Sequence, residues 1–311
     1  MAIIFKLKVS LIHTLIHLYT VFKIFYNYQF QVIQMKICWA NTDNFENADI
    51  VIIGIPDESK SHALRKGTSE APDKIREISC VRDTYTRDGK TSLGLPILGI
   101  KRKIYDYGNV KKTEIGNVIS NVVSKSKIPI SIGGDHSISS EIIKSISKKM
   151  GPVSLIYFDA HPDFIGSTQN YYGSVFYDSL PHIDLKSSLQ IGIRTPEQEE
   201  IENLKKYDIT VITPLDIVKN GIVETEKTIM SKIGKNVYVS FDMDAIDPAY
   251  APGVSVPVPM GLRNTEALYL LKSLAKRAIG IDIMEVCPEY DVKDRTSHLA
   301  SRMIAEIISS I

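Results

Sequence analysis

The fold is decided by the stretch IPISIGGDHSISSEIIKSISKKMGPVSLIYFDAHPD, which spans residues 128–163. Two short apolar runs, Ile128–Ile132 and Val153–Phe158, flank a segment in which isoleucines recur at helical spacing, Ser139–Lys149. A strand, a helix and a second strand in this order predict a βαβ unit, because parallel strands need a crossover connection of this length. The stretch therefore indicates a parallel sheet covered by helices.

The same alternation of strand-like and helix-like segments extends over the chain from about residue 50. The expected strands are Val51–Ile55, Lys103–Tyr107, Ile128–Ile132, Val153–Phe158, Ser188–Ile193, Ile209–Ile212, Asn236–Phe241 and Ile279–Val286. The expected helices are Ala71–Ser79, Lys112–Ser124, Ser139–Lys149, Pro196–Tyr207, Val223–Ile233, Asn264–Arg277 and Ser297–Ser309. This order predicts one α/β domain with three layers: a mainly parallel eight-stranded sheet with helices on both faces.

The composition excludes several classes of protein. In 311 residues, 37 Lys and Arg nearly balance 36 Asp and Glu, so we expect neither a nucleic-acid partner nor a membrane partner. Hydrophobic residues at 44% and charged residues at 23% are typical of a globular protein. The three cysteines, Cys38, Cys80 and Cys287, form no C-x-x-C pair. They indicate a reducing compartment, and we expect a cytoplasmic protein.

The first 34 residues differ from the rest of the chain. They contain three lysines and no acidic residue, and their uncharged run Val9–Phe22 is 14 residues long. A membrane-spanning helix needs about 20 apolar residues, and no clear signal-peptidase site follows the run. We interpret residues 1–34 as an atypical N-terminal extension and residues 35–311 as a single catalytic domain. An amphipathic docking segment is the alternative interpretation of the extension.

Acidic residues and histidines follow four of the predicted strands. They lie in GGDHS at 133–137, DAHPD at 159–163 and DMDAIDP at 242–248, and Glu285 stands near the end of a fourth strand. Ligand sites in parallel α/β sheets form at the carboxyl ends of the strands, so we expect these side chains to converge. Taken alone, such residues also have ordinary structural roles: Asp135 can cap a helix, and Asp247 before proline can shape a turn.

The types and spacing of these residues predict a metal site. Side chains at positions i, i+2 and i+4 of an extended segment point to one side. Crowded carboxylates repel one another and raise each other's pKa unless cations balance their negative charge. Two metal ions that share bridging carboxylates use more ligands than a single ion does. Oxygen-rich ligands without thiolate favour Mn²⁺, and the ligand types leave Zn²⁺, Co²⁺ and Fe²⁺ open. The candidate ligands are His136, Asp159, His161, Asp163, Asp242 and Asp244.

These motifs resemble the ureohydrolase family, which includes arginase, agmatinase and formimidoylglutamase. GGDHS, DAHPD and SFDMDAIDP at 240–248 match the three family signatures in order and spacing, and the segment 54–77 is similar to the family's amino-terminal segment. The resemblance covers about Ile50 to the C-terminus. It implies one Mn²⁺ on His136 and Asp163, a second on His161 and Asp244, and two bridging carboxylates, Asp159 and Asp242.

The resemblance also implies the chemistry of the site. A hydroxide shared by the two ions attacks the carbon of a small guanidino or amidine substrate, and an amine and urea are released. Asp163 accepts a proton from the water and passes it to the leaving amine. Glu285 holds the guanidinium through paired hydrogen bonds. Family members form trimers or hexamers, so a homo-oligomer is expected.

Two positions bear on the substrate. The Ala-Pro-Gly form at 251–253 is similar to agmatinase, whereas Val256 replaces a family hydroxyl that assists substrate binding. Tyr172 stands where relatives carry a histidine; it can bind substrate, but with an ordinary pKa of about 10 it is a poor proton shuttle. We expect agmatine as substrate, with formimidoylglutamate, arginine or another guanidino acid as alternatives. A non-enzymatic metal-binding protein is disfavoured because no ligand is missing.

Overall fold

The computed structural model describes residues 35–81, 86–87, 90–91 and 102–311. Residues Lys36–Ile311 form one compact unit. The interpretation of residues 1–34 as an extension lies outside the described residues. Within the described part of the chain, no helix combines the length and the apolarity that a membrane span requires.

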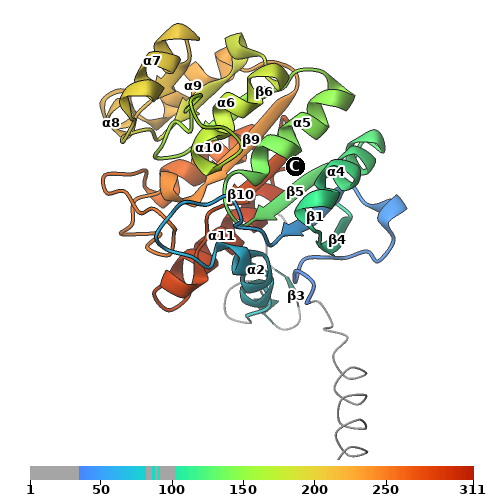
Figure 1. Ribbon diagram of the computed structural model, residues 1–311. Helices are drawn as coiled ribbons and strands as arrows, with labels where there is room; N and C mark the ends of the chain where they lie inside the picture. The colour runs from blue at the N-terminus through green and yellow to red at the C-terminus, as the bar shows by residue number, and fades with distance from the viewer. Residues whose placement is uncertain (1–34, 82–85, 88–89, 92–101) are drawn as a thin grey trace, which may run out of the picture. The chain divides into compact units, whose positions relative to one another are not determined.

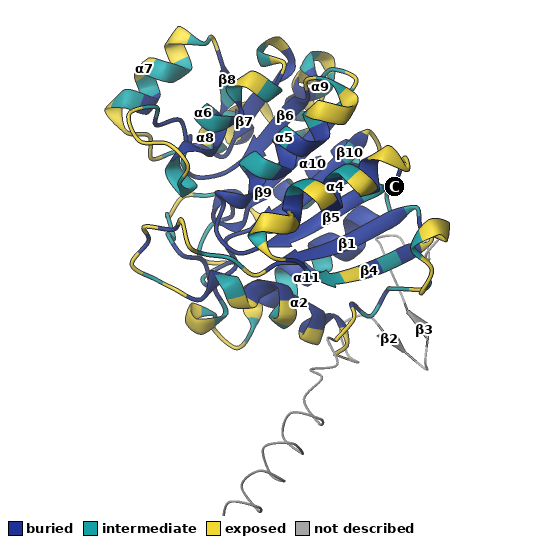
Figure 2. Ribbon diagram, turned by 45° about the vertical axis from the view of Figure 1, so that its right-hand side comes forward, coloured by how far each residue is buried: buried dark blue, intermediate teal, exposed yellow. Residues whose placement is uncertain are grey.

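Eight parallel strands form the central sheet, as expected from the sequence (Figure 1). Their order across the sheet is β4-β1-β5-β10-β9-β6-β7-β8, and every neighbouring pair is parallel. Both faces are covered, so the central strands are buried along their length (Figure 2). The strands are β1 (Ile50–Ile55), β4 (Ile104–Asn109), β5 (Ile128–Gly133), β6 (Ser154–Phe158), β7 (Leu189–Ile191), β8 (Thr210–Ile212), β9 (Val237–Asp242) and β10 (Ala278–Met284). A separate two-stranded hairpin pairs β2 (Thr86–Arg87) with β3 (Lys90–Thr91).

Helices cover both faces of the sheet and complete the three layers. The α-helices are α2 (Ala71–Ser79), α4 (Ile115–Ser124), α5 (Ile138–Met150), α6 (Val175–Ser179), α7 (Gln198–Lys206), α8 (Pro214–Asn220), α9 (Ile222–Lys232), α10 (Asn264–Ala275) and α11 (Arg295–Ile308). Alternate side chains of a strand point to opposite faces. Ile50 and Ile52 of β1 therefore join the core beneath α2, α10 and α11, whereas Val51 and Ile53 join the core beneath α4 and α5.

The structure differs from the predicted helices in three places. The segment expected to be helical from Lys112 begins with a 3₁₀ turn, Lys112–Glu114, before α4. The short helices α6 and α8 were not predicted. Helix α8 begins at a capping box in which Thr213 accepts the N–H of Asp216, and it ends at Gly221, whose φ is 82°.

A buried ion pair ties α2 to the edge strand β4. Arg76 donates from Nε to Asp106 Oδ2 at 2.9 Å and from a terminal nitrogen to Asp106 Oδ1 at 3.0 Å, and both side chains are fully buried. Asp106 Oδ2 also accepts the N–H of Ile37 at 2.7 Å. Arg76, one of two arginines in the 54–77 segment, is therefore a structural residue whose two parallel hydrogen bonds to Asp106 orient α2.

The strand register explains where the site forms. Met284 of β10 lies opposite Asp242 of β9, and Phe158 of β6 lies opposite Phe241. The residues that follow β6, β9 and β10 therefore leave the sheet side by side at its carboxyl edge. Strand β5 pairs with the other side of β10, which places His136 at the same edge. Segments 150 residues apart in the sequence meet there.

Candidate metal centre

The structure brings all six candidate ligands together, with His136 facing three of the carboxylates. The Nδ1 atom of His136 lies 3.0 Å from Asp159 Oδ2, 3.2 Å from Asp242 Oδ2 and 3.4 Å from Asp163 Oδ2. His136 and these three acids are buried. One imidazole nitrogen and three carboxylate oxygens thus point at a common position.

A second group of ligands adjoins the first and shares Asp159 with it. The Nδ1 atom of His161 lies 3.0 Å from Asp244 Oδ2 and 3.3 Å from Asp159 Oδ1. Asp159 therefore presents one oxygen to each histidine. Among the described residues, two sets can hold a metal ion: His136, Asp159 and Asp163, and Asp159, His161 and Asp244. The carboxylate of Asp159 belongs to both sets, and a pair of neighbouring cations requires such a shared ligand.

Asp242 is turned toward the first group. Its Oδ2 atom faces His136, and its Oδ1 atom accepts the backbone N–H of Asp244 at 2.7 Å. This second contact is local, two residues along the chain, and forms the N-cap of the 3₁₀ turn Met243–Ala245. Asp242 thus orders the segment that carries the next ligand as well as offering an oxygen itself.

The electrostatics of the cluster fit a cation site. Burial and neighbouring carboxylates raise the pKa values of Asp163 and Asp242 well above the ordinary value of an aspartate. They raise the pKa of Asp244 as well. Burial lowers the pKa of His161, but Asp244 and Asp159 outweigh it and raise this pKa to about 12. Four acids and two histidines in a buried site stabilise positive charge strongly, so the donor set suits divalent cations.

Behind His136 lies a chain of hydrogen bonds that the sequence did not reveal. The Nε2 atom of His136 lies 2.9 Å from Ser240 Oγ, and Ser240 Oγ donates to Asp282 Oδ1 at 2.9 Å. Tyr238 donates to the other oxygen of Asp282 at 2.6 Å. With its hydroxyl hydrogen committed to Asp282, Ser240 accepts from His136, which places the proton on Nε2 and leaves Nδ1 free to bind a metal.

Removing this support is expected to weaken metal binding. Ser240→Ala should lower the affinity for Mn²⁺ by about 10- to 100-fold, because outer hydrogen-bond partners fix the tautomer and orientation of a ligating histidine. The measurement is a competition titration with a chelating dye. Ser131→Ala is the matched control, since Ser131 is a buried strand serine whose Oγ has no hydrogen-bond partner among the described residues. Equal affinities in the two variants would show that Ser240 does not orient His136.

Tyr157 is a second neighbour of the ligands that sequence reasoning missed. Its hydroxyl donates to Asp163 Oδ2 at 2.5 Å and lies 3.0 Å from His136 Nδ1. Its ring stacks on the imidazole of His136, with centroids 4.7 Å apart and an interplanar angle of 3°. Tyr157 lies on β6 and reads in the sequence as an ordinary apolar strand residue, so nothing marked it as part of the site.

Glu285 lies directly beside the cluster and has an unusual backbone conformation. Its φ is 66°, a left-handed value that is uncommon outside glycine, and Asp163 has a φ of 46°. The Oε1 atom of Glu285 accepts the backbone N–H of His136 at 2.8 Å. The side chain is only 2% exposed, and burial raises its pKa to about 7. The fold thus holds a carboxylate in a fixed orientation next to the metal ligands.

A cavity of about 340 Å³ opens from the cluster toward the surface. His161 and Asp163 form its inner end, and Tyr172 and Val256 are among its walls. Burial, followed by the charges of Asp163 and Glu285, raises the pKa of Tyr172 further, so its hydroxyl stays protonated at neutral pH. The full lining is His161, Asp163, Ile165, Tyr171, Tyr172, Gly173, Thr195, Pro196, Glu197, Glu200 and Val256.

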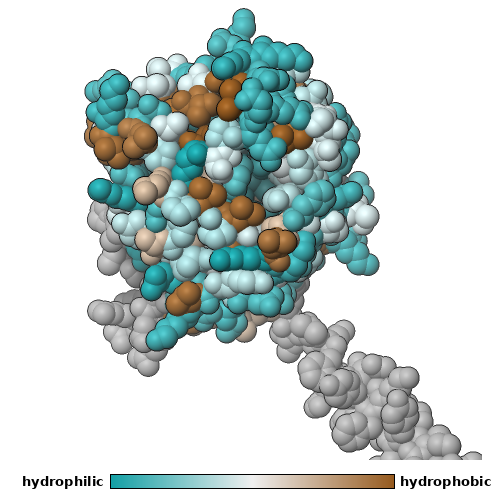
Figure 3. Space-filling model, turned by 60° about the vertical axis from the view of Figure 1, so that its left-hand side comes forward, coloured by the Kyte–Doolittle hydropathy of each residue, from teal (hydrophilic) through white to brown (hydrophobic). Residues whose placement is uncertain are grey.

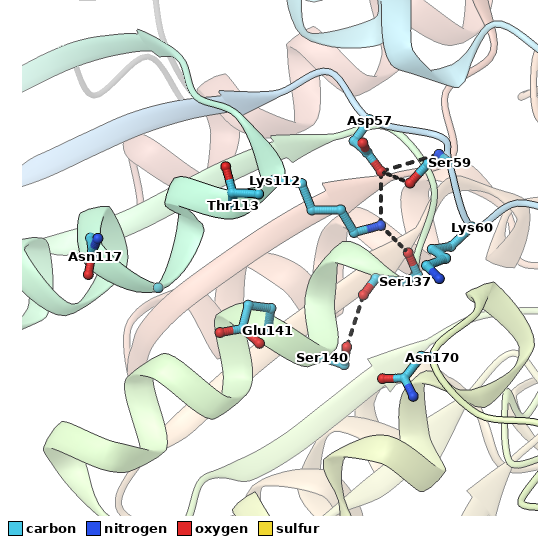
Figure 4. Close-up of a pocket in the computed structure, with 11 residues that line it drawn as sticks. Asp57, Ser59, Lys60, Lys112, Thr113, Asn117, Ser137, Ser140, Glu141 and Asn170 are labelled. Atoms are coloured by element: carbon cyan, nitrogen blue, oxygen red, sulfur yellow. Dashed lines mark hydrogen bonds and ion pairs between the residues drawn. The ribbon is translucent and has the colours of Figure 1, made fainter.

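A second cavity, of about 590 Å³, lies between the start of α4 and the start of α5 (Figure 4). Lys112 extends across it and donates to Asp57 at 2.8 Å and to Ser137 Oγ at 3.1 Å. Two of its charged groups, Lys112 and Asp57, are thus paired with each other. Lys60 lines this cavity and, through its carbonyl, accepts the N–H of Tyr172 at 3.3 Å.

Asp135 and Asp247 hold loops rather than metal. Asp135 does not cap α5, whose N-cap residue is Ser137 and has no side-chain cap hydrogen bond. It accepts the N–H of Ser137 at 2.9 Å and the N–H of Lys60 at 3.0 Å. Asp247 accepts the N–H groups of Ala249 and Gly261 and so shapes the loop after β9. Neither belongs to the two groups that can hold a metal ion.

A parallel α/β fold with a histidine–carboxylate cluster at its strand ends defines a candidate metal-dependent enzyme of the α/β class. The model of the arginase family matches residues 48–309, and the chain belongs to that family. It is a ureohydrolase, an enzyme that acts on C–N bonds, and it is most like agmatinase.

Individual relatives support this assignment. The chain is 32% identical to an agmatinase of Neisseria meningitidis over 277 residues, covering 84% of this chain and 87% of the relative. It is 30% identical to a human mitochondrial guanidino acid hydrolase, covering 86% of this chain and 79% of the relative. The solved structure of an agmatine ureohydrolase from Thermoplasma volcanium superposes with a TM-score of 0.78 at 32% identity, covering 89% and 94% of the two chains.

Proposed function

We propose that this protein hydrolyses agmatine to putrescine and urea. The observation that carries the choice of substrate is the charge of the cavity next to the cluster. Its described lining contains the acids Glu197 and Glu200 but no lysine or arginine. A substrate with a positively charged tail suits such a cavity, whereas a substrate with a carboxylate on its tail is repelled by it.

The tail of agmatine is an ammonium group, and the outer wall of the cavity is built to receive it. Glu197 lies exposed at the N-cap of α7, and Glu200 is buried one helical turn further on. Tyr171 and Tyr172 line the same cavity. Burial, followed by Asp163, Glu197 and Glu200, raises the pKa of Tyr171 to about 12, so its hydroxyl stays protonated at neutral pH. Arginine carries a carboxylate beside its amine, and the described lining offers that carboxylate no lysine or arginine.

The roles of the inner residues follow from their positions. We assign His136 and Asp163 to one divalent cation, His161 and Asp244 to a second, and Asp159 and Asp242 to both. When bound, the two cations supply the positive charge that lowers the pKa of an attacking water toward neutrality.

Two carboxylates then act on the substrate and its proton. Glu285 receives the guanidinium in a paired geometry and fixes its plane. Asp163 accepts the proton of the attacking water and donates it to the leaving amine. Tyr172 contributes a hydrogen bond to the substrate from the cavity wall.

The proposal includes four further assignments. The oxygen-rich, thiolate-free ligand set supports Mn²⁺ as the metal, and the lack of a C-x-x-C pair among the three cysteines of the sequence supports a cytoplasmic location. Residues 35–311 act as one catalytic domain, supported by the single compact unit from Lys36.

The chain assembles as a homo-oligomer, a trimer or hexamer, and the exposed Leu215 and Val218 of α8 support such association. Hydrophobic residues form several separate groups on the face shown in Figure 3.

A substrate panel tests the proposal. Protein reconstituted with Mn²⁺ is incubated with agmatine, arginine, a guanidino acid and formimidoylglutamate, and urea and formamide are measured separately. We expect urea from agmatine with a kcat/KM at least about 100-fold above that of arginine, because the described cavity lining has glutamates but no lysine or arginine to pair with the carboxylate of arginine. Formamide from formimidoylglutamate, or faster release of urea from a guanidino acid, would refute agmatine as the substrate and leave the assignment of the metal ligands standing.

A further inference from the structure

We propose that Ser255 is the positioning residue of the guanidinium site: its hydroxyl holds the Glu285 carboxylate in the orientation that receives a planar cation. The proposal rests on the proposed function of Glu285 and names the residue that makes this function possible. Ser255 is buried, and its Oγ donates to Glu285 Oε2. The other oxygen, Oε1, accepts the N–H of His136 at 2.8 Å.

The segment that carries Ser255 is fixed by contacts that do not involve Glu285. Arg65 donates from one terminal nitrogen to the carbonyl oxygens of Pro252 and Val254, at 3.3 Å each, and its guanidinium packs over the Tyr290 ring. The N–H of Gly253 donates to Thr296 Oγ1 at 2.8 Å. Ser255 is therefore presented to Glu285 by a loop with its own anchors.

The segment is also tied to the chain just after Glu285. Cys287 donates its N–H to the carbonyl of Gly253 at 2.7 Å, and Val254 and Val286 form an antiparallel bridge. A Cβ atom added to Gly253 would lie 2.8 Å from the Cα of Asp291, so only glycine allows this close approach. The serine and the glutamate are thus held in a fixed relative position by the backbone on both sides.

Ser255 and Val256 are adjacent in this segment but contact different groups. Val256 lines the substrate cavity, whereas Ser255 points to Glu285 and is absent from the described lining. The sequence indicated that Val256 removes a hydroxyl from the substrate site. In the structure the hydroxyl that reaches Glu285 comes from Ser255, the residue before Val256. The cavity wall is therefore apolar at Val256, while the Glu285 carboxylate keeps a hydroxyl partner.

The hydrogen-bond capacity of Glu285 allows it to bind both partners and a substrate. Each carboxylate oxygen has two lone pairs, and His136 and Ser255 use one on each oxygen. One lone pair on each oxygen is left for the two parallel N–H groups of a guanidinium. Rotation of the carboxylate plane would break one of the two supporting hydrogen bonds, so together they fix the plane in which the guanidinium binds.

The test compares Ser255→Ala and Ser255→Thr with the parent protein. Binding of butylguanidine to the Mn²⁺-loaded protein is measured by calorimetry, and the KM and kcat for agmatine are measured in parallel. Ser255→Ala should weaken binding of the probe by about 10- to 100-fold, the effect of losing one hydrogen bond to a charged group. KM should rise by a similar factor with a smaller change in kcat. Ser255→Thr, which keeps the hydroxyl, should restore most of the affinity.

Ser301→Ala is the control, because Ser301 is equally buried and its Oγ has no hydrogen-bond partner among the described residues. It should leave affinity, KM and kcat unchanged. Parent-like affinity in Ser255→Ala, or a loss that Ser255→Thr fails to restore, would overturn the proposal. So would a parent protein that does not bind the probe. A parent that binds butylguanidine without hydrolysing agmatine would contradict the proposed function alone.

Discussion

Asp242→Asn is expected to reduce release of urea from agmatine by at least about 10³-fold while the fold is retained. The substitution keeps the size of the side chain and an oxygen that can accept the N–H of Asp244. It removes the negative charge that faces His136 at 3.2 Å and that the proposal shares between two cations. Urea release and bound Mn²⁺ per chain, measured on the same preparation, should fall together.

Asp247→Asn provides the comparison for this prediction. Asp247 lies in the same DMDAIDP segment, but its carboxylate accepts backbone N–H groups, from Ala249 on Oδ1 and from Gly261 on Oδ2, and belongs to neither group of metal ligands. An asparagine there keeps an acceptor for one of these two N–H groups and removes no metal ligand, so metal content and activity should stay near those of the parent. If Asp242→Asn retained full activity, the account of a two-metal centre would be wrong.

Glu285→Gln is expected to separate substrate binding from metal binding. The amide keeps an oxygen for the N–H of His136 but lacks the charge and the second acceptor that a guanidinium requires. We expect kcat/KM for agmatine to fall by at least about 100-fold, since the buried hydrogen-bonded charge pair with the substrate is lost. Bound Mn²⁺ per chain should be unchanged.

The control for this variant is Glu289→Gln. Glu289 is exposed, four residues further along the same connection, so its substitution tests for general effects of changing charge there. It should leave kcat/KM unaltered. A loss of Mn²⁺ in Glu285→Gln as large as in Asp242→Asn would assign Glu285 to the metal cluster rather than to the substrate.

The sequence predicted the sheet well because its strands are short runs of apolar residues separated by amphipathic segments. A buried parallel strand such as β6 reads SLIYF, with four apolar residues in a row, and the helix before it carries isoleucines on one face. The rule that sites form at the carboxyl ends of parallel strands then places His136, Asp159 and Asp242 at one edge from the sequence alone.

Other features depended on tertiary contacts that no local pattern reports. Tyr157 and Ser240 lie within strands and reach His136 only because β5, β10, β9 and β6 follow one another across the sheet. The short helix α8 depends on a capping box at Thr213, and its exposed Leu215 gives no amphipathic signal. The sequence pattern assigned no role to Ser255, whose contact with Glu285 depends on how two loops far apart in the sequence are anchored.

The most direct test of the account is an anomalous scattering experiment on crystals of the Mn²⁺-loaded protein. Data collected on both sides of the manganese absorption edge locate each manganese ion independently of the protein model. The account predicts two peaks, one beside His136 and Asp163 and one beside His161 and Asp244, with Asp159 and Asp242 in contact with both. A single peak, or manganese bound away from these six side chains, would contradict it.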